Sequence, residues 1–73
     1  MRIAHRARSL ADAQNARDVL LALGIPAYIA DEALWSTGSL PGGELIRVMV
    51  DNRAQDRARL ALVEWHKQEQ ANR

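Results

Sequence analysis

The chain lacks cysteine, a long apolar run and any large excess of one charge. Without cysteine it can form neither a disulfide nor a thiolate nucleophile, which fits a reducing compartment. No apolar run approaches the ~20 residues that cross a bilayer, and the charged N-terminal segment is unlike the core of a signal peptide. We therefore expect a cytoplasmic protein with no membrane partner.

Net charge is also small, because ten basic residues nearly cancel nine acidic ones and leave a formal charge of +1. Such a chain has no strong field to attract a polyanion, so nucleic acid is not expected as a partner. The arginines form a cluster near the N-terminus and another in the last third of the chain, and aspartates lie near both. We interpret both clusters as solvated faces. The clusters are Arg2, Arg6 and Arg8, and Arg53, Arg57 and Arg59, with Asp12, Asp51 and Asp56 nearby.

The 73 residues suffice for one small domain, which we place at residues 1–67, with 68–73 as a frayed tail. A domain of this size buries roughly 60% of the surface that its unfolded chain exposes, so its core is marginal. Association with a second copy would reinforce such a fold.

The first half of the chain predicts a strand, a helix and a sharp turn. Residues 2–7 read as a short strand, and Ser9 is a suitable N-cap for a helix over residues 10–23. Its apolar stripe begins with alanines, which let a helix lie close on a sheet. Gly24 and Pro26 then end the helix and start an extended segment over residues 25–30.

The second half predicts a long connection, a strand and a second helix. Residues 31–44 form the connection, within which 31–35 could make one helical turn that lays Leu34 and Trp35 on the core. Residues 45–50 alternate so that Ile46, Val48 and Val50 share one buried face. A cap at residues 51–52, with Gln55 in a relaxed capping box, starts a helix over residues 53–66.

The predicted order is strand, helix, strand, strand, helix, which defines an α+β fold. A right-handed crossover makes the first two strands parallel, and the third fits between them in the opposite direction. The result is a βαββα domain with a three-stranded mixed sheet in the order 1-3-2. Both helices lie on one face, as in a truncated ferredoxin-like fold.

Several of these features together resemble a family of small bacterial domains named putative prokaryotic signal-transducing proteins. They are the alanine-faced first helix, the segment Gly24–Ile29, the Leu40-Pro41-Gly42 loop, the Val48-x-Val50 strand and the Ala54/Ala58 start of the last helix. The resemblance covers roughly residues 2–65. It implies a compact ferredoxin-like or nitrogen-regulator-like domain with a role in signalling, and it supplies no catalytic residues.

Few residues suggest chemistry. His5 and His66 lack partners at metal-ligand spacing, and the glycines of residues 38–43 lead into a strand without the lysine of a phosphate loop. Asp31, Glu32 and Glu44 bracket the long connection and could line a ligand site there. We expect no enzyme activity, no metal and no cofactor.

The face of the sheet away from the helices is the most informative surface. Tyr28, Arg47 and Met49 should point there, and the first strand should add either His5 or Ala4. Tyrosine, arginine and methionine are enriched at interfaces, although a wet face with scattered apolar residues fits equally. Trp35 is a second candidate anchor.

These observations predict a small non-catalytic binding module that forms a homodimer or binds another protein. The contact would be the bare sheet face or the free edge of the first strand. The alternative is a small-molecule or metabolite sensor in which residues 31–44 close over a ligand.

Overall fold

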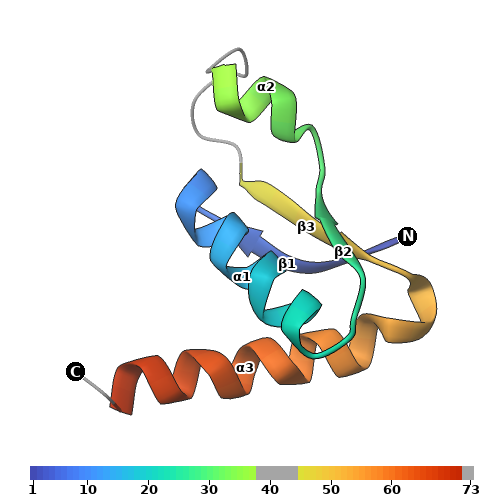
Figure 1. The fold of residues 1–73 in the computed structure, drawn as a ribbon, viewed down its shortest axis with the longest axis vertical. Helices are drawn as coiled ribbons and strands as arrows, with labels where there is room; N and C mark the ends of the chain where they lie inside the picture. Colours follow the sequence, from blue (N-terminus) through green and yellow to red (C-terminus); the bar gives the residue numbers. More distant parts are fainter. Residues whose placement is uncertain (38–44, 72–73) are drawn as a thin grey trace.

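The computed structural model describes residues 1–37 and 45–71. It confirms the predicted α+β fold and shows a short helix at the place in the long connection where one helical turn was predicted (Figure 1). The elements in chain order are β1 (Arg2–Ala7), α1 (Leu10–Ala22), β2 (Ala27–Ile29), α2 (Glu32–Thr37), β3 (Ile46–Val50), a 3-10 turn η1 (Asn52–Ala54) and α3 (Gln55–Ala71).

The three strands form one sheet in the predicted order, β1-β3-β2. Strand β3 lies in the middle and pairs antiparallel with both neighbours, so β1 and β2 run in the same direction at the two edges. Met49 is opposite Ile3 on one side and opposite Tyr28 on the other. Because cross-strand partners share a face, these three side chains form one row across the sheet.

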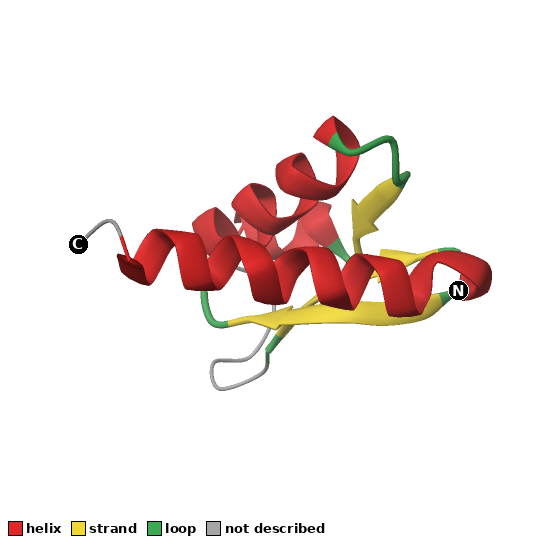
Figure 2. Cartoon of the chain, turned by 90° about the horizontal axis from the view of Figure 1, so that it is seen from below, coloured by secondary structure: helices red, strands yellow, loops and turns green. Residues whose placement is uncertain are grey.

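Helices α1 and α3 pack on the same side of the sheet (Figure 2). Ala13 and Ala16 of α1 and Ala58 of α3 are fully buried, and their small side chains let both helices approach the strands closely. Larger side chains fill the rest of the core, and the largest of those that are fully buried are Leu20, Ile25, Val48 and Val50. The predicted burial of alternate β3 residues is confirmed.

The turn after α1 forms as the sequence predicts. Gly24 has a φ of +78°, and the amide of Ile25 reaches back to the carbonyl of Leu20 at 2.9 Å. A second bond joins the amide of Gly24 to the carbonyl of Leu21 at 3.0 Å. These two bonds are the Schellman motif, and the buried Leu20 and Ile25 supply the apolar contact that often accompanies it.

One prediction about β1 is wrong, because a bulge shifts the register between Ile3 and His5. Ala4, at the bulge, is buried toward the core, and His5 is opposite Val48, whose side chain faces the helices. Neither residue therefore lies on the bare face. Ile3 and Arg6 lie there instead, opposite Met49 and Arg47.

Other differences concern the ends of elements. Strand β2 is shorter than the predicted residues 25–30, and α3 continues to Ala71 rather than ending at His66. Leu34 is 44% exposed and does not join the core. The capping box is also absent, since Asp51 caps η1 by accepting from the amide of Arg53 at 2.9 Å. Gln55 makes a different contact, described below.

Candidate functional site

The bare side of the sheet, here called the open face, consists of Ile3, Arg6, Tyr28, Arg47 and Met49. Its apolar row crosses all three strands: Ile3 and Met49 are half-buried, and Tyr28 is 46% exposed at the edge. The helices that cover the other face leave this row uncovered. The structure thus brings the predicted interface residues Tyr28, Arg47 and Met49 onto one surface.

Beside the apolar row lies a second row, which is charged. Arg6 is opposite Arg47, and Arg47 Nη2 lies 3.3 Å from Asp31 Oδ2. Asp31 follows β2 and has a φ of 57°, a left-handed conformation that aspartate tolerates better than most residues. The open face therefore carries charges of both signs next to its apolar row.

The carboxylates predicted to line a ligand site in residues 31–44 do not meet in the described part of the chain. Asp31 pairs with Arg47 of β3, whereas Glu32 Oε2 lies 3.0 Å from Arg17 Nη1 of α1. The third, Glu44, lies outside the described residues, as does the side chain of Trp35. The ligand loop and the tryptophan anchor stay predictions.

Both histidines have partners within the fold. His5 Nε2 lies 3.2 Å from Asp12 Oδ2, so this side chain joins β1 to the first turn of α1. His66 Nε2 lies 3.1 Å from the side-chain nitrogen of Gln70, one turn further along α3. These contacts favour structural roles for the two residues.

The free edge of β1 is modified in ways that discourage strand pairing. The bulge interrupts its ladder, and Gln55 Nε2 of α3 donates to the carbonyl of Ile3 at 3.1 Å. Arg2 and Arg6 add charge along the strand. Bulges and charged side chains are the devices that keep natural edge strands from pairing with other chains. Of the two predicted contact surfaces, the open face is therefore the better candidate.

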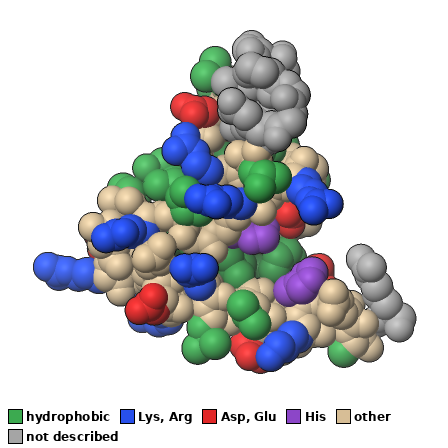
Figure 3. Space-filling model, turned by 180° about the vertical axis from the view of Figure 1, so that it is seen from behind, with side chains coloured by type: hydrophobic (Ala, Val, Ile, Leu, Met, Phe, Trp, Pro, Cys, Tyr) green, Lys and Arg blue, Asp and Glu red, His purple; other side chains and the backbone are tan. Residues whose placement is uncertain are grey.

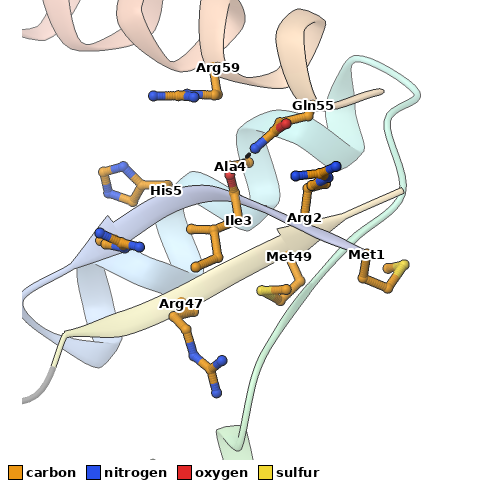
Figure 4. Close-up of a pocket in the computed structure, with 10 residues that line it drawn as sticks. Met1, Arg2, Ile3, Ala4, His5, Arg47, Met49, Gln55 and Arg59 are labelled. Atoms are coloured by element: carbon orange, nitrogen blue, oxygen red, sulfur yellow. Dashed lines mark hydrogen bonds between the residues drawn. The ribbon is translucent and has the colours of Figure 1, made fainter. Parts of the chain in front are cut away.

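A hollow of about 530 Å³ lies along the same edge, between β1 and α3. We call it the basic hollow, because Arg2, Arg6, Arg47 and Arg59 all line it (Figure 4). In the space-filling view from behind, Lys and Arg side chains are spread over this face of the molecule, with Asp and Glu side chains between some of them (Figure 3). The other residues that line the basic hollow are Met1, Ile3, Ala4, His5, Met49 and Gln55.

The basic hollow was not predicted from the sequence, in which its arginines belong to two separate clusters. In the structure α3 packs against β1, which brings Arg59 of one cluster beside Arg2 and Arg6 of the other. The predicted topology already placed the last helix on the same sheet as the first strand. It could therefore have indicated that arginines of the two clusters lie close together.

The fold and these surfaces define a small α+β domain with one covered and one bare sheet face. The chain belongs to the family described as putative prokaryotic signal transducing protein, whose model matches residues 1–66. No curated protein and no solved structure matches it significantly. Among the described residues, no helix has both the length and the apolar character needed to traverse a bilayer.

Proposed function

We propose that this domain is a non-catalytic docking module that acts in bacterial signalling by forming a homodimer through its open face. The observation that carries the proposal is the apolar row of Ile3, Met49 and Tyr28, which crosses every strand without a helix above it. Membership in a family described as signal transducing supports a role in signalling.

The charges of the open face suit a second copy of this chain as the binding partner. In a two-fold contact the same patch meets itself, so each group needs a complementary group on the same surface. The open face has Arg6 and Arg47 on one side of the row and Asp31 beside them. Arg47 of one copy can then meet Asp31 of the other while the two apolar rows pack together.

The size of the molecule limits how tight this dimer can be. A standard interface buries about 800 Å² on each partner. The described chain exposes 5119 Å², so such a contact would cover roughly a sixth of it. Three short strands supply only part of that area, and we therefore expect a micromolar dimer.

The test is sedimentation velocity from about 1 to 500 µM, a range that brackets a micromolar dissociation constant. We expect the sedimentation coefficient of the wild type to rise from monomer to dimer. In Met49→Gln, an unbranched side chain of similar size puts a polar amide at the centre of the apolar row. Fully burying a methionine contributes about 1.5–3 kcal/mol, and a two-fold contact covers the exposed part of Met49 on both copies, so the variant should weaken the dimer about tenfold.

The matched control is Leu60→Gln, on α3. Leu60 is 63% exposed and lies on the helical side, so this variant removes exposed apolar surface away from the open face. It should leave the dimer unchanged. A wild type that stays monomeric at the highest concentration would refute the proposal, and so would equal weakening by the two variants.

A further inference from the structure

The basic hollow has an unusual balance of charge for a chain whose total charge is near zero. Four arginines line it, and no aspartate or glutamate of the described part of the chain does. Arg47 has Asp31 as a partner, but the guanidinium groups of Arg2, Arg6 and Arg59 make no hydrogen bond or ion pair with any residue of the described ranges 1–37 and 45–71. Their guanidinium groups keep their donors available.

These arginines come from three elements that the fold holds together. Arg2 and Arg6 belong to β1, Arg47 to β3 and Arg59 to α3. The bond from Gln55 to the bulge carbonyl of Ile3 ties α3 to β1 beside them. Figure 4 shows Arg2 and Arg59 on the helical side of β1, with Arg47 beyond the strand. Guanidinium donors therefore lie on both sides of the edge strand β1.

The chemistry of the lining indicates the class of ligand. A guanidinium fork matches phosphate oxygens with two parallel hydrogen bonds, and several forks together suit an anion of more than one charge. The volume of about 530 Å³ lies within the range of small-molecule sites. No Phe, Tyr or Trp among the described residues lines the hollow, so its lining favours recognition of phosphates over stacking on a nucleobase.

We infer that the basic hollow binds a small oligophosphate, either inorganic or the phosphate tail of a nucleotide, through Arg2, Arg6 and Arg59. The ligand lies along the outer edge of β1 and accepts hydrogen bonds from these guanidinium groups, which have no partner in the described part of the chain. Binding there requires neither a second copy nor the long connection, and the basic hollow shares Ile3, Arg6, Arg47 and Met49 with the open face. Phosphate binding and self-association are measured separately, so either proposal can fail without the other.

The experiment is a titration of the isotope-labelled chain with inorganic triphosphate, followed by amide NMR shifts. A parallel arm uses a nucleoside triphosphate, and a third uses citrate, a polyanion that carries its charge on carboxylates. We expect triphosphate to shift the amides of Arg2, Ala4, Gln55 and Arg59 and to bind more tightly than citrate. If the nucleoside triphosphate binds as tightly as inorganic triphosphate, the protein recognises only the phosphates. If the nucleotide binds more tightly, the protein also contacts its nucleoside.

The decisive comparison is between two arginines of the same helix. Arg59→Gln removes a donor of the basic hollow, whereas Arg57→Gln makes the same charge change at a residue outside its lining. Loss of a hydrogen bond to a charged group should weaken triphosphate binding about tenfold in Arg59→Gln. Arg57→Gln should bind like the wild type.

Three results would overturn the inference. The first is a wild type whose spectrum does not change with triphosphate. The second is a set of shifts confined to residues outside the basic hollow. The third is equal weakening by Arg57→Gln and Arg59→Gln, which would show that triphosphate responds to net charge alone. Circular dichroism of both variants would confirm that each keeps its fold.

Discussion

The two faces of the sheet differ in composition and in exposure. The covered face contains Ile29, Ile46, Val48 and Val50, each less than 5% exposed beneath α1 and α3. The open face carries the row of Ile3, Met49 and Tyr28 with arginines beside it, and Tyr28 is 46% exposed. This difference separates two tasks, because side chains on the covered face hold the fold together while those on the open face remain available for binding.

The largest effect should come from the helix that seals the covered face. Leu20→Ala removes one of the largest fully buried side chains, and such changes cost about 2–5 kcal/mol. The whole fold is worth roughly 4–11 kcal/mol at this length, so the variant should be close to unfolding. Urea denaturation followed by circular dichroism measures the change.

Leu21→Ala is the matched control for this prediction. Leu21 is the next residue of α1 and is 49% exposed, so its truncation leaves no cavity in the core. We expect it to cost less than about 1 kcal/mol. Similar losses in the two variants would show that α1 does not seal the sheet as described.

A smaller effect is expected at the turn that joins α1 to β2. A Cβ at Gly24 would meet no atom within 4 Å, so Gly24→Ala adds no clash and tests the positive φ alone. The left-handed conformation costs a residue with a Cβ about 1 kcal/mol. For a domain of this size, thermal unfolding should shift down by roughly 4–8 °C.

Gly24→Asn sharpens this prediction, because asparagine tolerates the left-handed conformation better than alanine. Its melting temperature should lie between those of the wild type and the alanine variant. An alanine variant as stable as the wild type would mean that the turn is not held in this conformation.

The smallest effect is expected for the ion pair at the margin of the open face. Asp31→Asn keeps a residue that accepts a positive φ and removes the charge that faces Arg47, where both side chains are about half exposed. Exposed pairs contribute about 0–1 kcal/mol, so monomer stability should barely change. In the proposed dimer the same variant should weaken self-association, and sedimentation velocity can measure that effect. A large loss of monomer stability would contradict this view of the pair.

The features that the sequence predicted well depend on neighbours in the chain. Gly24 and Pro26 define a turn by their own backbone preferences, and the alternation of Ile46, Val48 and Val50 requires only that one face be buried. The order of the strands followed from these elements and from the handedness of crossovers. The family resemblance, now shown by the match over residues 1–66, agreed with that order.

The features that the sequence did not predict depend on contacts between distant segments. The bulge in β1 arises where this strand pairs with β3, more than forty residues later, and no local pattern at Ala4 or His5 specifies it. Gln55 looked like a capping residue because its actual partner, the carbonyl of Ile3, is 52 positions away. The basic hollow was missed for the same reason, since its arginines are separated along the chain.

The central claim is that the open face docks a second copy without contributing much to the stability of the monomer. Its most direct test is the urea midpoint of the wild type and of Met49→Gln, each measured at several protein concentrations. A dimer stabilises the folded state by mass action, so the wild-type midpoint should rise with concentration and that of the variant should rise less over the same range. A wild-type midpoint that is independent of concentration would contradict the account.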